Sequence, residues 1–216
     1  MRKMVILMVL AVIFLSLTGA DLLAKGNGAL GGNSAGGYYD YPDGEEIAAL
    51  QHMREEEKLA RDVYRLLFDV WGSPIFSNIA ASEQQHMDAL GRLITKYGLI
   101  DPVGDNGPGV FENVELQNLY DELTAAGQVS LVDALIVGAS IEDLDIADLI
   151  EAYCNTDNQD LQTVYLNLTK GSRNHLRAFV SEIEQRGVQY PAQYLDQQAV
   201  DEILSGLSAM RGITTG

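Results

Sequence analysis

The sequence predicts an all-α protein whose main domain is an antiparallel four-helix bundle with one long crossover between helices two and three. Four long segments carry apolar residues at alternating steps of three and four, which is the spacing of a helix with one buried face. Only short links join the first segment to the second and the third to the fourth, so each pair must lie antiparallel. Residues 99–128 separate the two pairs, a length that can cross from one end of a bundle to the other.

Capping residues place the ends of these helices. Asp43 is a candidate N-cap for the first helix, which stops at Gly72, and Pro74 suits the first turn of the second. Ser130 is a plausible N-cap for the third, and Gly187 ends the fourth. We therefore expect bundle helices over about residues 44–71, 74–97, 131–154 and 158–186, with shorter amphipathic stretches at 112–126 and 196–210.

The chain divides into four parts. Residues 1–20 combine two basic residues, an apolar run too short for a typical spanning helix and a small-residue end, which indicates a signal peptide. The alternative is an uncleaved N-terminal anchor that tethers the domain to a membrane. Residues 21–43 form a flexible Gly-rich linker, 44–187 the bundle, and 188–216 a C-terminal extension with a short helix. We expect export to the periplasm, the cell surface or the medium.

Charge and cysteine content restrict the partners. The chain has 14 basic and 31 acidic residues, a net charge of −17. Cleavage after residue 20 would leave 12 basic residues and a charge of −19. Such a field repels phosphate backbones and attracts metal cations, so nucleic acid is not an expected partner. The single cysteine, Cys154, cannot form an intrachain disulfide. The sequence leaves the oligomeric state open and allows a homodimer.

The second helix carries a metal-ligand motif on its apolar face. Glu83 and His86 are three residues apart, so they share one side of the helix, at positions where core residues belong. An inward-facing Glu-x-x-His is a ligand motif of carboxylate-bridged two-metal bundles, which also need a Glu from each of two other helices.

The other three helices supply further polar groups at buried positions. The first offers Glu57, with Glu56 on the neighbouring stripe as a rival. Burying several carboxylates without a cation costs several kcal/mol per uncompensated charge, whereas two divalent ions would neutralise four of them. Imidazole nitrogens are ligands that iron and manganese accept. The predicted site comprises two divalent ions, iron or manganese, held by the following side chains: Glu57, Glu83, His86, Glu142, Asp145 and His175.

Several motifs resemble those of one family. The stretches "EEEKLARDVY", "FSNIAASEQQHMDAL", "ALIVGASIEDLDIADL" and "LTKGSRNHLRAF" resemble the DUF2202 family, an uncharacterised branch of the ferritin-like superfamily, over about residues 45–187. The first is also similar to the first helix of rubrerythrins. The resemblance implies a ferritin-like bundle and supports five of the ligands: Glu57, Glu83, His86, Glu142 and His175.

One position departs from the rubrerythrin pattern. Ser172 stands three residues before His175, where rubrerythrin-like proteins have a Glu. From spacing, we expect Asp145, one turn beyond Glu142, to replace that acid.

Two functions are compatible with these features. The first is an exported ferritin-like domain with a dinuclear centre that oxidises Fe(II) or reduces peroxide or O₂. Because the chain has no Cys-x-x-Cys pair, electrons would come from another protein or a small reductant. The alternative is a non-catalytic binding or structural module with a degenerate metal site, which Ser172 and the linker favour.

Overall fold

A computed structural model describes residues 41–206 of the chain. The expected signal peptide, nearly all of the Gly-rich linker and the last ten residues lie outside the described residues. Within residues 41–206, no helix is both long and apolar enough to span a membrane.

The prediction of an all-α fold is confirmed, because every regular element between residues 41 and 206 is a helix. The four predicted bundle helices correspond to α1, α2, α4 and α5, and the two short stretches to α3 and α6. The bounds are α1 Gly44–Trp71, α2 Pro74–Lys96, α3 Val114–Gly127, α4 Leu131–Cys154, α5 Gln159–Glu184 and α6 Gln197–Leu204.

Local sequence signals begin and end the first two helices as expected. The Asp43 carboxylate accepts hydrogen bonds from the backbone N–H groups of Glu45 and Glu46, and the Glu46 side chain accepts one from the Asp43 backbone. Gly72 ends α1 in the left-handed conformation, with φ of 63°. Pro74 then starts α2 after a link of two residues, so α1 and α2 form a tight antiparallel hairpin.

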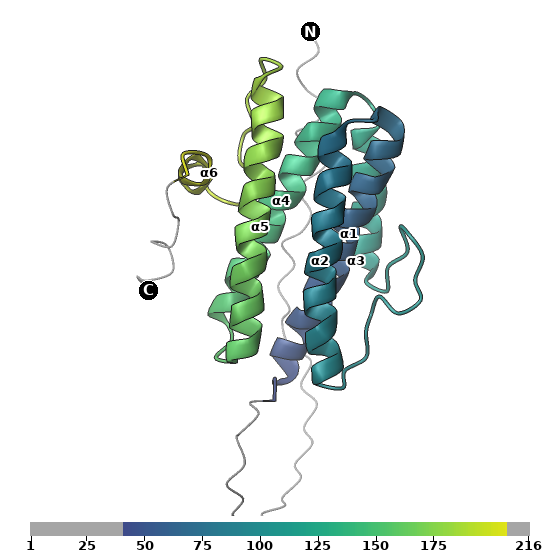
Figure 1. Ribbon diagram of the computed structural model, residues 1–216, viewed down its shortest axis with the longest axis vertical. Helices are drawn as coiled ribbons and strands as arrows, with labels where there is room; N and C mark the ends of the chain where they lie inside the picture. The colour runs from purple at the N-terminus through teal and green to yellow at the C-terminus, as the bar shows by residue number, and fades with distance from the viewer. Residues whose placement is uncertain (1–40, 207–216) are drawn as a thin grey trace, which may run out of the picture. The chain divides into compact units, whose positions relative to one another are not determined.

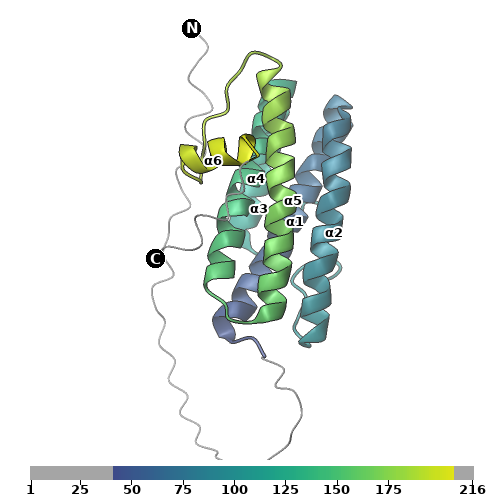
Figure 2. The same cartoon turned by 60° about the vertical axis from the view of Figure 1, so that its left-hand side comes forward.

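The bundle consists of two such hairpins packed face to face (Figure 1). Helix α1 packs mainly on α2, and α4 mainly on α5, while α1 also contacts α4 and α2 contacts α5. The crossover between the hairpins contains α3, which lies against both α1 and α4. Figure 2 shows α6 outside the four helices, where it packs on α5 and its Ile203 carbonyl accepts a hydrogen bond from Arg177.

Buried charges on α1 hold the crossover in place. The Lys58 ammonium donates to the Asp62 carboxylate at 2.6 Å and to the backbone carbonyl of Gly107 at 2.8 Å. Glu55 accepts the backbone N–H of Glu112 at 2.6 Å. A loop whose backbone groups are bonded to buried side chains cannot shift without leaving those charges unpaired, which costs several kcal/mol.

A similar anchor on α4 holds the C-terminal segment. Asp143 is fully buried, and its carboxylate accepts hydrogen bonds from the Tyr190 hydroxyl at 2.9 Å and from the backbone N–H groups of Gln193 and Leu195 at 2.6 and 2.9 Å. The segment before α6 is therefore part of the packed domain.

The apolar core is divided in two by a polar layer. One cluster contains Tyr64, Phe76 and Phe179, whose rings pack with centroids 5.3 to 6.4 Å apart. The other cluster, nearer the opposite end of the helices, contains Leu50 and Leu161. Between them, all four bundle helices place acids and histidines toward the centre, where apolar side chains would otherwise lie.

Candidate metal centre

The polar layer brings together five of the residues predicted from the sequence. Glu57, Glu83, Glu142 and His175 are buried and His86 is partly buried; the side chains of His86 and His175 are 12% and 11% exposed. One comes from each of α1, α4 and α5, and two come from α2; the set is Glu57, Glu83, His86, Glu142 and His175.

These side chains form two groups that share Glu83. In the first group, His86 Nδ1 lies 3.2 Å from Glu57 Oε2 and 2.7 Å from Glu83 Oε2. In the second, His175 Nδ1 lies 2.8 Å from Glu83 Oε1 and 3.3 Å from Glu142 Oε2. The two imidazole rings are stacked, with centroids 5.6 Å apart. Each oxygen of the Glu83 carboxylate thus faces one group, and each group could hold a metal ion.

The geometry between these atoms suits metal ligands. Glu83 Oε1 and His175 Nδ1 approach to 2.8 Å, yet neither makes a hydrogen bond, because the angles are wrong for one. Glu57 Oε1 likewise accepts no hydrogen bond. Two ligand atoms at right angles around an ion, with bonds of about 2.1 Å, lie roughly 3 Å apart. Carboxylate oxygens and imidazole nitrogens at these separations fit iron, manganese or zinc.

Neighbouring hydroxyl groups orient two of the ligands. Ser82 Oγ lies 3.0 Å from His175 Nε2. When Nε2 carries the proton and donates it to Ser82, the lone pair of Nδ1 faces the site. On the other side, the buried Tyr64 hydroxyl donates to Glu142 Oε1 at 2.6 Å.

A glycine on α5 makes room for His86. A Cβ atom at Gly171 would lie 2.5 Å from His86 Nε2 and 2.7 Å from His86 Cε1, far inside van der Waals contact. The imidazole can stand against α5 only because this position has no side chain. Sequence reasoning missed Gly171, since the close approach of α2 and α5 is a tertiary property.

The groups of the polar layer differ in how readily they ionise. Burial opposes ionisation of Glu83, but the two histidines outweigh it and lower the pKa of this carboxyl to about 2. Burial also disfavours charged imidazoles, but Glu57 and Glu83 raise the pKa of His86 to about 12, and Glu142 and Glu83 raise that of His175 to about 10. Without a metal, both imidazoles are therefore protonated at pH 7.

The remaining acids ionise less easily. Burial, reinforced by Asp145, raises the pKa of Glu57, and burial together with Glu83 raises that of Glu142. Burial and the charge of Glu142 raise the pKa of Asp145 to about 8. Protons thus balance the charge of the layer in the absence of a cation.

Asp145 lies beside the site rather than within either group. The Ser172 hydroxyl donates to Asp145 Oδ2, while Oδ1 accepts no hydrogen bond. Its electrostatic effect reaches Glu57, but its carboxylate belongs to neither group around Glu83. The role of Asp145 as a ligand in place of the acid absent at position 172 stays a prediction.

The three consecutive acids of α1 point to three different surroundings. Glu55 binds the crossover, Glu57 faces the central site, and Glu56 faces a third group with His52 and Asp148. Glu56, the rival ligand, is therefore not part of the two central groups. Sequence reasoning passed over His52 and Asp148. The spacing of four residues between His52 and Glu56, which puts both on one helix face, was the available signal.

The chain is thus an all-helical bundle whose acid and histidine groups could hold metal. A family model described as "Uncharacterized protein domain (DUF2202)" matches residues 46–207, a range that includes α6, and the chain belongs to this family.

One curated protein and one solved structure are similar to this chain. The chain is 52% identical to "Uncharacterized protein MJ0754" of Methanocaldococcus jannaschii over 169 residues, which are 78% of this chain and 91% of the relative. It is also similar to the crystal structure of hypothetical protein MJ0754 from Methanococcus jannaschii, with a TM-score of 0.75 and 48% identity, covering 82% of this chain and 98% of the other.

Proposed function

We propose that this ferritin-like domain binds two divalent ions, iron or manganese, between α1, α2, α4 and α5, and uses them to oxidise Fe(II) or to reduce peroxide or O₂. The single observation that carries the proposal is the position of Glu83, whose two oxygens each face a separate Glu–His group. A carboxylate shared in this way holds two ions close together, as in the carboxylate-bridged helical bundles.

Charge balance supports two ions rather than one. The layer buries the carboxyl groups of Glu57, Glu83, Glu142 and Asp145. In the metal-free protein, protons on the imidazoles and on the acids of raised pKa offset this charge. Two divalent cations carry four positive charges and would replace those protons, so metal uptake and proton release are coupled.

The surroundings suit redox chemistry in a sheltered site. When bound, a pair of Fe(II) or Mn(II) ions would supply two electrons to one molecule of peroxide or O₂. The apolar clusters on both sides keep bulk water out of the layer, and Tyr64 and Ser82 hold two ligands in orientation. Since the chain has a single cysteine, electrons for turnover come from another protein or a small reductant. With residues 1–20 as a signal peptide, we place this activity outside the cytoplasm.

The test is single-turnover oxidation of Fe(II). The full chain is loaded with two equivalents of Fe(II) without oxygen and mixed with O₂ or peroxide, while near-ultraviolet absorption of an oxo-bridged ferric pair is followed. Rapid growth of this band in the wild type and its loss in Glu83→Ala is the expected result. Asp88→Asn, which changes an exposed acid on the same helix, is the control and keeps the band. A rate in the wild type no faster than that in Glu83→Ala would refute the redox role.

One observation favours the non-catalytic alternative. The Ser172 hydroxyl donates a hydrogen bond to Asp145, and that carboxylate lies outside both groups that share Glu83. A site with this acid withdrawn could bind ions without turning over. Metal uptake with no ferric band on addition of either oxidant would support this second function.

A further inference from the structure

A third cluster of ligand-type side chains lies apart from the central groups. It comprises His52 and Glu56 from α1 and Asp148 from α4, which offer ligand atoms within 4.8 Å of one another. No member of this outer group belongs to the two groups around Glu83, so the two sites can be changed separately.

Glu56 is the feature that calls for a ligand. This side chain is only 2% exposed, and neither of its carboxylate oxygens accepts a hydrogen bond from the described residues. His52 Nε2 lies 3.9 Å from Glu56 Oε2, which is ion-pair range but too long for a hydrogen bond. A buried carboxylate without hydrogen-bond donors is costly, so the group needs either a shared proton with Asp148 or a cation.

Other cations of the fold near this part of α1 are already bonded. Lys58, two residues further along the helix, donates to Asp62 and Gly107. Arg54, two residues before Glu56, pairs with Asp101 and donates to the backbone of Met87. Their charges are therefore directed elsewhere.

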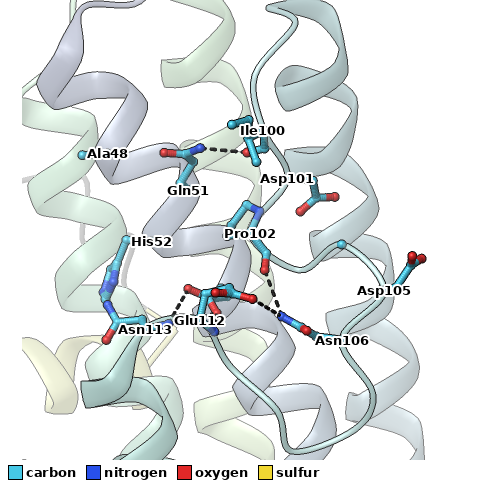
Figure 3. Close-up of a pocket in the computed structure, with 12 residues that line it drawn as sticks. Ala48, Gln51, His52, Ile100, Asp101, Pro102, Asp105, Asn106, Glu112 and Asn113 are labelled. Atoms are coloured by element: carbon cyan, nitrogen blue, oxygen red, sulfur yellow. Dashed lines mark hydrogen bonds between the residues drawn. The ribbon is translucent and has the colours of Figure 1, made fainter.

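The outer group is reachable from solvent through His52. The His52 side chain is 39% exposed and lines a surface pocket of about 540 Å³ between α1 and the crossover (Figure 3). The same pocket is lined by acids from α1 and the crossover, namely Glu55, Asp101, Asp105 and Glu112. Such a concave acidic surface raises the local concentration of cations.

From these observations we propose that His52, Glu56 and Asp148 bind one divalent transition-metal ion, separately from the central pair. One imidazole nitrogen and two carboxylate oxygens form a ligand set that manganese, iron and zinc accept, and water completes the coordination from the pocket side. The proposal does not depend on the proposed function, because none of its ligands is shared with the central groups.

The experiment counts Mn(II) ions bound to the full chain by electron paramagnetic resonance of free Mn(II). In Glu83→Ala/His86→Ala, which disables the central groups, we expect one ion per chain. Adding His52→Ala and Asp148→Asn should remove it, whereas Asp69→Asn, an exposed acid on α1, should not. Binding of no ion by the Glu83→Ala/His86→Ala protein, with helical circular dichroism intact, would overturn the proposal.

A second comparison keeps the test decisive should the double variant not fold. In the otherwise wild-type chain, His52→Ala/Asp148→Asn should lower the stoichiometry by one ion, from three to two. An unchanged stoichiometry would overturn the outer site. A wild type that binds a single ion, lost in this pair of substitutions, would support the outer site while contradicting the central one.

Discussion

Replacing Gly171 by alanine should weaken metal binding strongly while changing the free energy of unfolding only slightly. The added methyl would lie 2.5 Å from His86 Nε2, about 1 Å inside the usual contact distance of roughly 3.5 Å between non-bonded atoms. Because Gly171 sits within α5, the helix itself gains about 1 kcal/mol from alanine, while crowding of the core costs about 1 to 3 kcal/mol. The imidazole is the group that yields, since it lies at the end of a rotatable side chain.

Displacement of the His86 ring should disturb the metal site. A ring displaced by about 1 Å moves Nδ1 away from the point between Glu57 and Glu83. Disturbing the support of a ligand typically costs 10- to 100-fold in metal affinity, and displacing the ligand itself costs at least that. We therefore expect Gly171→Ala to weaken Mn(II) or Fe(II) binding about 100-fold, with a change in the free energy of unfolding of the metal-free protein of at most about 2 kcal/mol.

The assay is competition with a chelator of known affinity, alongside urea unfolding of the metal-free chain. Gly91→Ala on α2 is the matched control, because its Cβ would lie 3.4 Å from the guanidinium of Arg54 on α1, an ordinary contact. That variant should keep wild-type metal affinity. Wild-type affinity in Gly171→Ala would refute the assigned position of His86 against α5.

Three other predictions concern protons and anchoring. At pH 7 the metal-free protein holds protons on His86 and His175, whose pKa values are about 12 and 10, so metal loading should release at least two protons per chain. Titration in weakly buffered solution measures this release, and fewer than one proton would contradict the assigned charges. Because of these raised pKa values, the native metal-free protein binds more protons than the unfolded chain between about pH 6 and 9, so its free energy of unfolding should fall as pH rises through that range. Urea midpoints that do not change with pH would contradict this prediction. Asp143→Ala removes the acceptor for Tyr190 and neighbouring backbone N–H groups, so it should lower the free energy of unfolding by about 3 kcal/mol and expose the segment before α6 to proteases. Limited proteolysis follows this exposure, and unchanged protection would argue against the anchor.

The helix bounds could be predicted because their signals are local. Asp43, Gly72 and Pro74 each act within one turn, and the structure places both ends of α1 and the start of α2 at these residues. The Glu83–His86 pair was equally accessible, since a spacing of three on an apolar face depends only on helix geometry. Five predicted ligands meet in the structure because each lies on the buried stripe of its own helix.

Other features depend on how helices and loops pack, which periodicity does not describe. Glu55, Glu56 and Glu57 are chemically identical, and their different surroundings follow from the crossover on one side and α4 on the other. Asp148 approaches Glu56 only through the contact of α1 with α4. The position of Asp145 outside the Glu83 groups likewise reflects its hydrogen bond to Ser172, a detail that spacing along one helix cannot reveal.

The most direct test of the central claim is the number of metal ions held around Glu83. The His52→Ala/Asp148→Asn chain, purified without chelators and reloaded anaerobically with Fe(II) or Mn(II), is measured by elemental mass spectrometry with and without Glu83→Ala. Two ions per chain, both lost when Glu83 is replaced, is the predicted result. Retention of the ions in the Glu83→Ala protein, or no uptake by the starting chain, would contradict a carboxylate-bridged pair at the centre of the bundle.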